Sequence, residues 1–298
     1  MTIHYISKFD PPYHTERYIA EALAWLGYKV ECYEFDHDWD RPEKVKAGDI
    51  MLTALPQRFG AAQLQAWKDA GVFLATWYFD WIGADGNGYK GRELAYGAKL
   101  KLFDAVFSTD GDTDEWYQLR GIKRFWLPQA VPPEDRVIFD PAHERHDLVF
   151  LGHRNGQRRC DMLDAVGKRF DLKVYGDYKQ PRLWGRAFCS AVQASKIVLG
   201  DNYLNHIPRY WSNRVYVVLA AGGFLLTPRV TGLDAQFTDG KHLVMHDGGD
   251  DLFRKIEKWL KRPRDRARIA QNGHREVHRN HTYLHRTVEL MTTIEGLR

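Results

Sequence analysis

One carboxyl group stands among four aromatic side chains in the stretch Trp77-Tyr78-Phe79-Asp80-Trp81. Because this stretch completes the apolar run 72–78, which is typical of a buried strand, Asp80 is expected at the carboxyl end of that strand. Apolar neighbours raise the pKa of a carboxyl group, which suits a general base. We therefore predict that Asp80 deprotonates an acceptor hydroxyl, with Trp77, Tyr78 and Trp81 stacking a sugar or a nucleobase. The alternative is a strand end with core aromatics and an Asp that caps a turn.

A second acidic stretch, Thr109-Asp110-Gly111-Asp112, ends the apolar run 105–109. Asp110 is the next candidate for the base. The spacing of Asp110 and Asp112 is that of a metal-binding Asp-x-Asp pair, but capping of a helix expected at 113–119 explains it better. The histidines at 274, 278, 281 and 285 lie at helical spacing without an acidic partner in a metalloprotease-like frame. We predict no metal site.

Two basic turns could hold phosphate groups. The first, 152–158, follows an apolar strand-like run and opens a helix, so its backbone NH groups and arginines suit a diphosphate. The second, 210–214, opens a helix at 215–221; a capped helix start would leave NH groups for phosphate, and an arginine there could neutralise a departing nucleotide. The alternative for both is a solvated turn. The predicted phosphate-binding residues are Gly152, Arg154, Asn155, Arg158, Ser212, Asn213 and Arg214.

Strand-like and helix-like segments alternate along the chain, which predicts parallel, doubly wound α/β sheets. Strands are expected at 3–7, 28–35, 49–54, 72–78, 105–109 and 125–127, and helices at 15–26, 61–70, 92–102 and 113–119. A proline-rich, charged interval at 128–146 reads as a linker. The pattern restarts with strands at 147–151, 172–175, 196–199, 224–227 and 241–246, and helices at 156–168, 215–221 and from 250. We predict domains at 1–127 and 147–281 and a final helix at 282–298.

Composition excludes several classes of protein. The 298 residues carry a formal net charge of +4, which permits an anionic partner without requiring one. The three scattered cysteines and the N-terminus, which lacks the features of a signal peptide, favour a reduced cytoplasmic protein without structural zinc. No apolar run is long enough to span a membrane. No GxxxxGK[ST] motif is present, so a P-loop protein has no support.

The second half of the chain carries motifs in a recognisable order. They are DLVFLGHRNGQRR at 147–159, LAAGGFLLTP at 219–228, FTDGKHLV at 237–244 and the stretch 262–286. Together they resemble the donor half of glycosyltransferases with the two-Rossmann B-type fold, especially the spore-maturation-like group. The first half resembles such enzymes loosely, chiefly in FDAVFSTDGDTDEW at 103–116.

The resemblance implies two Rossmann-like domains, with the last helix crossing back onto the first. It implies a UDP-sugar co-substrate in the C-terminal domain, no cofactor, no metal, and an acceptor against the N-terminal domain. In such enzymes the loop Gly240-Lys241-His242 lines the nucleotide pocket, so Lys241 and His242 join the donor site. The family position of Arg158, one turn into the helix, favours it over Arg154.

One position departs from the family. Related enzymes have a glutamate two residues before the Leu-Ala pair, where its carboxylate holds the donor ribose, and this chain has Val217. A valine cannot accept a hydrogen bond. A non-catalytic module that binds a nucleotide sugar or a glycan is therefore the alternative function.

The sequence leaves the identity of the acceptor open. An envelope glycan or protein is one class. A hydroxymethylated DNA base, as in phage-type modifying enzymes, is a narrower one, because Lys8, Arg58, Lys90 and Arg92 could join the aromatics at 77–81 in a basic, stacking face.

Overall fold

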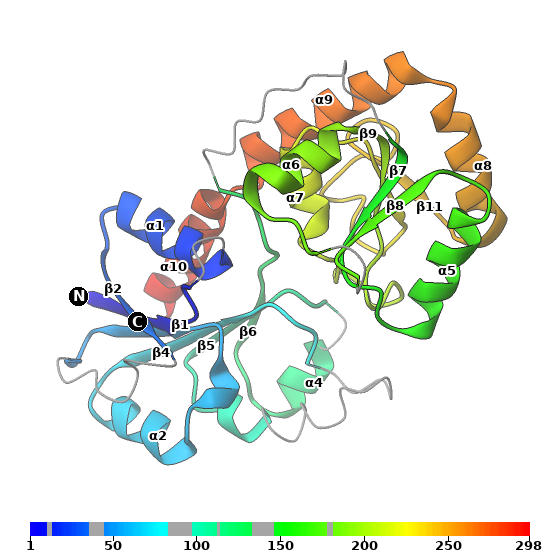
Figure 1. Cartoon of the computed structure of the whole chain (residues 1–298). Coiled ribbons are helices and arrows are strands. Elements are labelled where there is room, and N and C mark those ends of the chain that lie inside the picture. The colour runs from blue at the N-terminus through cyan, green and yellow to red at the C-terminus, as the bar shows by residue number, and fades with distance from the viewer. Residues whose placement is uncertain (11–13, 36–44, 83–96, 112–113, 133–145, 178–180) are drawn as a thin grey trace. The chain divides into compact units, whose positions relative to one another are not determined.

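The structure is a computed structural model that describes residues 1–10, 14–35, 45–82, 97–111, 114–132, 146–177 and 181–298 (Figure 1). Within these residues the chain divides into two compact units. The first comprises Met1–Gln129 and Tyr283–Arg298, and the second comprises Ala130–Thr282. The expected helix at 92–102 lies partly outside the described residues. Lys90, Arg92 and Asp112 also lie outside them.

The first unit is built on a parallel sheet with the strand order β2-β1-β3-β4-β5-β6. Its strands are β1 (Thr2–Ser7), β2 (Lys29–Glu34), β3 (Ile50–Thr53), β4 (Phe73–Tyr78), β5 (Ala105–Ser108) and β6 (Arg124–Trp126). Its helical elements are α1 (Thr15–Trp25), η1 (Pro56–Arg58), α2 (Ala61–Asp69), α4 (Asp114–Leu119) and α10 (Tyr283–Leu297). Strands β3, β4 and β5 are mostly apolar and buried except for half-buried Phe73, as expected for central strands of a parallel sheet.

The C-terminal helix α10 belongs to this first unit and lies beside α1 (Figure 1). The rings of Tyr18 and Tyr283 stack with centroids 6.1 Å apart, and the hydroxyl of Tyr28 donates a hydrogen bond to Glu295 at 2.7 Å. Buried Leu290, together with these contacts, fixes the end of the chain on the first sheet.

The second unit repeats the pattern with the strand order β11-β10-β9-β7-β8, again all parallel. Its strands are β7 (His146–Leu151), β8 (Leu172–Tyr175), β9 (Ser195–Leu199), β10 (Leu225–Pro228) and β11 (Val244–His246). Its helices are α5 (Gln157–Gly167), α6 (Gly185–Gln193), α7 (Arg214–Ala220), α8 (Gly249–Leu260) and α9 (Pro263–Asn280). A core that includes Phe150, Ile197, Leu226, Ile256 and Ile269 joins this sheet to α8 and α9.

These sheets and helices confirm the predicted α/β class with two Rossmann-like, doubly wound domains. Helix α6 was not predicted, although Phe188, Ala191 and Val192 lie at helical spacing; much of the helix is exposed. The segment 232–237 forms consecutive turns in which Leu233 and Phe237 are buried, and the backbone nitrogen of Phe237 donates to the backbone oxygen of Leu233 at 2.9 Å, as in one turn of helix.

Candidate functional site

The carboxylate of Asp201 collects two arginines at the carboxyl edge of the second sheet. Because β9 ends at Leu199, Asp201 emerges where the strand ends. The guanidinium of Arg158 donates to both carboxylate oxygens, with Nη1 2.9 Å from Oδ1 and Nη2 3.0 Å from Oδ2. The Nε of Arg159 donates to Oδ2 at 2.8 Å. Both arginines come from the first turn of α5, which follows β7, the strand next to β9.

A third arginine joins them from α7. Arg214 donates from Nη1 to the backbone oxygen of Asp201 at 2.7 Å and from Nε to that of Leu151 at 2.5 Å, so it ties the ends of β9 and β7 together. Burial lowers the pKa of Arg214 to about 10, and the charge of Arg159 adds to this effect. Arg214 therefore stays positive at neutral pH. We call Arg158, Arg159, Arg214 and Asp201 the arginine cluster.

Gly152, directly after β7, makes room for the arginine cluster. A Cβ atom at this position would overlap the guanidinium of Arg214, so a larger residue would displace that side chain. The loop that follows is organised by Arg159, whose Nη1 donates to the backbone oxygen of His153 at 3.0 Å and to the Oδ1 of Asn155. The predicted phosphate-binding turn is thus held from inside by an arginine.

The arginine cluster has an excess of positive charge. Burial alone would raise the pKa of Asp201, but hydrogen bonds from Arg158, Arg159 and Asn205 outweigh it and hold this pKa below its usual range. Three guanidinium groups against one carboxylate leave an excess of two positive charges. The Arg158 side chain is 53% exposed, whereas that of Arg159 is 7% and that of Asp201 1% exposed. Arg158 is therefore the group that a solvent-borne anion meets.

The other residues that were predicted to bind phosphate at this edge make different contacts. Arg154 donates to Asp164 at 2.5 Å on the surface of α5. The Ser212 hydroxyl accepts a hydrogen bond from the backbone nitrogen of Arg214 at 3.2 Å, and the next two amides bind the backbone oxygens of Ser212 and Asn213. The start of α7 thus has its NH groups already bonded, which removes the expected NH site for phosphate. Val217, half-buried, follows one turn later.

Lys241 and His242 lie away from the arginine cluster, contrary to the prediction. They precede β11, and because the strands are parallel, the residues before a strand lie toward the opposite edge from those after it. His242 is buried, accepts a hydrogen bond from the backbone nitrogen of Thr238 at 3.3 Å and faces Glu276 of α9 at 3.8 Å. Burial lowers the pKa of His242, so it acts as a neutral packing residue. Lys241 is exposed at the same edge.

In the first unit the predicted base is exposed, whereas the predicted stacking residues are buried. Asp80 is exposed just after β4. Trp77, Tyr78 and Trp81 are 1%, 4% and 2% exposed, and the Trp77 ring nitrogen donates to the backbone oxygen of Leu127 at 2.9 Å. Rings buried to this extent expose no face on which a sugar or a nucleobase could stack. The predicted stacking role of these three residues therefore does not fit the structure. They build the core because strand residues on both faces of this parallel sheet are covered.

Asp110 is a structural residue. Its side chain is fully buried and lies 3.2 Å from the Nη2 of Arg124, whose Nε also donates to Ser108 at 2.8 Å. A carboxylate held in this way inside the sheet layer is not placed to reach an acceptor hydroxyl. Lys8 is half-buried after β1, and Arg58 is exposed with its guanidinium 5.2 Å from the centre of the Phe35 ring.

Glu16 was missed by the sequence analysis. It lies in the first turn of α1, is 8% exposed, and accepts a hydrogen bond from the hydroxyl of Ser7, which ends β1, at 3.4 Å. Burial raises the pKa of Glu16 to about 7. No sequence signal marked it, because an acidic residue in a first helical turn is ordinary and its burial depends on tertiary packing.

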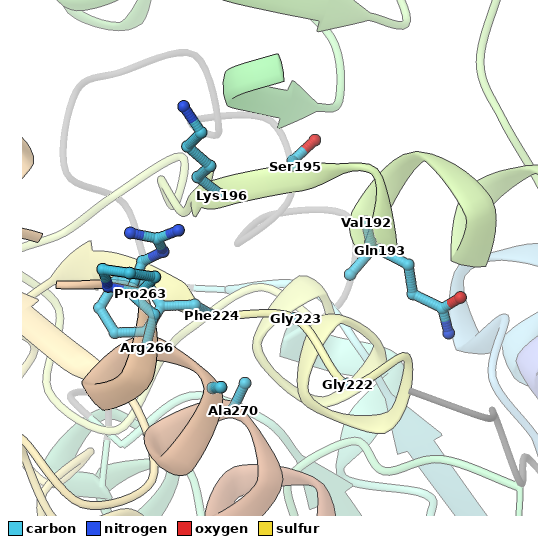
Figure 2. A pocket seen from close by; sticks show the side chains of 11 residues that line it. Val192, Gln193, Ser195, Lys196, Gly222, Gly223, Phe224, Pro263, Arg266 and Ala270 are labelled. Carbon is cyan, nitrogen blue, oxygen red and sulfur yellow. The ribbon is translucent and has the colours of Figure 1, made fainter. Parts of the chain in front are cut away.

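A pocket in the second unit lies at the opposite edge from the arginine cluster. Figure 2 shows Ser195, Gly223 and Phe224 around it, which are residues at the starts of β9 and β10. Its Arg266 donates from Nη1 to the backbone oxygens of Trp259 and Leu260 at 2.7 and 3.0 Å, where α8 ends. This arginine therefore closes a helix end, and the pocket is not part of the candidate site.

The described residues include no cluster of three or more His, Cys, Asp and Glu side chains arranged to hold a metal ion. Among the described helices, none combines the length and the apolar composition needed to cross a membrane.

Comparison with known proteins concerns the fold and the class of domain. Residues 157–292 match the family model described as "Glycosyl transferase-like". No curated protein sequence matches the chain. Among solved structures, sucrose-phosphate synthase from Thermosynechococcus elongatus superposes with a TM-score of 0.68 at 11% identity, covering 100% of this chain and 99% of that one. HepE from Anabaena in complex with UDP-glucose has a TM-score of 0.69 at 12% identity, with 99% and 100% covered. A glycosyltransferase from Rickettsia africae has a TM-score of 0.64 at 10% identity, with 99% and 98% covered.

At these identities the structural likeness establishes the fold. The chain has the two-domain, Rossmann-like architecture of B-type glycosyltransferases, and residues 157–292, which comprise most of the second unit and part of α10, are similar to a glycosyl transferase-like domain.

Proposed function

We propose that the chain is a glycosyltransferase that moves a sugar from a nucleoside diphosphate sugar, with UDP as the expected nucleotide, to a hydroxyl group. The observation that carries this proposal is the arginine cluster at the carboxyl edge of the second sheet. In parallel α/β sheets this edge is where nucleotides bind. The excess of two positive charges matches the two negative charges of the diphosphate in a nucleotide sugar. The complex of HepE with UDP-glucose, a protein of the same fold, supports the choice of donor.

The arginines act on the leaving group. As the bond between the anomeric carbon and the diphosphate oxygen breaks, the electron pair stays on that oxygen and the diphosphate gains negative charge. Arg158 keeps its Nε–H and one N–H of Nη1 outside its hydrogen bonds to Asp201 and Asn202, so these donors can bind this oxygen region, and Arg214 adds a fixed positive charge. Because Asp201 and Arg159 hold these groups in place before the donor arrives, little reorganisation is needed during the reaction. Positive charge from arginine can perform the task that a divalent metal has in other enzymes, so we propose metal-independent transfer.

The acceptor is assigned to the first unit. Asp80, at the exposed end of β4, remains our proposed base, which takes the proton of the acceptor hydroxyl as its oxygen bonds to the anomeric carbon. An envelope glycan or protein, as for spore-maturation-like enzymes, and a hydroxymethylated DNA base, as for phage-type enzymes, both present such a hydroxyl. Cys32, Cys160 and Cys189 are free thiols, which supports our proposal of a reducing, cytoplasmic location.

Melting temperatures with a panel of nucleotide sugars test this function. A donor that binds only the folded chain must raise the melting temperature. We expect one or more UDP-sugars to do so, and expect the same compound to release UDP when glycan and hydroxymethylated DNA acceptors are supplied. If no nucleoside diphosphate sugar stabilises the protein, the proposal fails.

Half-buried Val217 favours a second candidate, a non-catalytic module that binds a nucleotide sugar or a glycan. This candidate predicts stabilisation by a nucleotide sugar or a glycan without release of nucleotide from any donor in the panel. Turnover with any acceptor rejects it.

A further inference from the structure

One segment of the chain is strongly basic. The 20 residues 261–280 carry seven Lys or Arg and two Asp or Glu, which is a net charge of +5, whereas the whole chain has +4. The rest of the molecule is therefore close to neutral. This segment consists of α9 and the two residues before it, and it packs on α7 and α8 of the second unit (Figure 1).

Four exposed arginines of α9 form a straight stripe. Arg264, Arg268, Arg275 and Arg279 are separated by four, seven and four residues. At about 100° per residue these positions fall within roughly 60° of one another around the helix axis, and they extend over about 22 Å. The buried residues of α9, including Ile269, Gly273 and Val277, occupy the opposite side. All four arginine side chains are exposed. We call these four residues the arginine stripe.

Few neighbouring acidic side chains neutralise the charge of the arginine stripe. Arg268 pairs with Asp265 at 2.9 Å, and Arg275 donates to the amide oxygen of Asn272 at 2.8 Å. Within the described part of the chain, Arg264 and Arg279 have no hydrogen-bond or ion-pair partner. The other acid of the segment, Glu276, is turned away toward His242 and His281.

The composition of this face distinguishes between polyanions. Helices that lie in a membrane surface pair basic residues with exposed Trp, Phe or Leu. The large exposed apolar side chains of the described residues are Met1, Trp25, Leu119, Trp184 and Val288, and none is on α9. Gln271, exposed between the arginines, is polar as well. Guanidinium groups bind phosphate oxygens with paired donors, and a duplex offers a phosphate about every 3.4 Å along each strand. A stripe of this length and polarity therefore fits a nucleic-acid backbone better than a lipid surface.

We propose that the arginine stripe of α9 binds the phosphodiester backbone of duplex nucleic acid. Binding of this type is independent of sequence and weakens steeply as salt is added. The proposal does not depend on glycosyl transfer, because it concerns a surface distant in sequence from the arginine cluster and is measured without a sugar donor.

The test uses a fluorescent DNA duplex of about 20 base pairs and follows its anisotropy with the full chain over a series of salt concentrations. One variant combines Arg264→Gln, Arg268→Gln, Arg275→Gln and Arg279→Gln. Its matched control removes the same charge elsewhere, by Arg17→Gln, Lys101→Gln, Lys123→Gln and Lys168→Gln, which are exposed residues outside α9. A milder variant, Arg264→Gln with Arg279→Gln, covers the case in which the fourfold change disturbs folding.

We expect the wild-type chain and the control to bind with similar salt dependence. The stripe variant should bind at least about tenfold more weakly, with a salt slope lower by about 3 to 4, since each lost phosphate contact removes about 0.9. The milder variant should lose about half of that slope. Absence of salt-dependent binding by the wild-type chain overturns the proposal, and so does an equal loss in control and stripe variant. Stripe-dependent binding to phosphatidylglycerol vesicles without binding to the duplex would show a lipid surface instead.

Discussion

Replacing Asp201 by Asn removes the carboxylate that collects the arginine cluster while keeping the shape of the side chain. Arg158 and Asn205 are near solvent and can be rehydrated, but Arg159 is 7% exposed and would be left as a buried, uncompensated charge beside Arg214. Breaking a buried ion pair in this way costs about 3–5 kcal/mol. For a unit of this size we therefore expect Asp201→Asn to lower the melting temperature by about 6–20 °C.

The pH dependence of this loss follows from the lowered pKa of Asp201. A carboxyl group whose folded pKa is depressed contributes stability above its unfolded pKa and loses it as the pH falls through the folded pKa. The difference in unfolding free energy between wild type and variant should be constant from about pH 5 to 8 and should shrink below about pH 4.

Urea unfolding followed by tryptophan fluorescence measures this difference. The control is Asp161→Asn, an exposed carboxylate on α5 that accepts a hydrogen bond from Gln157 and should change stability by less than about 0.5 kcal/mol. If Asp201→Asn costs no more than the control, the cluster is an ordinary hydrated surface network and our account of its pre-arrangement is refuted.

Three further substitutions test other parts of the molecule. Val217→Glu should tighten binding of the donor if the half-buried position retains the geometry of related enzymes, which calorimetric titration measures; a misfolded variant would show that the site has become core. Asp80→Asn should lower turnover by roughly 10²-fold or more with unchanged melting temperature, and normal turnover would reject Asp80 as the base and direct attention to Glu16. Burial raises the pKa of Glu16 to about 7. Its protonated form therefore contributes stability that is fully present below the unfolded pKa and is lost as the pH rises through 7. Glu16→Gln should therefore stabilise the protein by up to about 3 kcal/mol at pH 8 and leave it unchanged near pH 4, in urea unfolding at both values; equal effects at both would contradict the burial argument.

The regular part of the fold could be predicted from the sequence because local patterns determine it. Strands such as β4 and β8 are short apolar or alternating runs, and their observed bounds differ from the predicted ones by at most one residue. The turn between β7 and α5 could also be predicted, because glycine directly after a strand and before a helix is a local signal. In contrast, α6 was not predicted, because its apolar residues Phe188, Ala191 and Val192 are few and much of the helix is exposed.

The candidate site was predicted only in part because burial and pairing are tertiary properties. Arg158 and Arg214 were identified, but Asp201 and Arg159 were not, although the position of Asp201 just after β9 is a signal that could have found it. Asp80 and Trp77 are close in the sequence, yet one is exposed and the other is in the core. Lys241 and His242 were assigned to the site through a resemblance, and the short strand β11 places them toward the other edge.

The central claim is that the arginine cluster binds a nucleoside diphosphate through its phosphates. Calorimetric titration of UDP and of uridine into the wild-type chain and into Arg158→Ala tests it most directly. We predict that UDP binds the wild-type chain at least about tenfold more tightly than uridine and that Arg158→Ala weakens UDP binding by about 1–3 kcal/mol, because charge-assisted hydrogen bonds to phosphate are lost. Arg154→Ala, a change in the same loop that removes an arginine already paired with Asp164, should have little effect. Equal binding of UDP and uridine, or an unchanged UDP affinity in Arg158→Ala, would contradict the account.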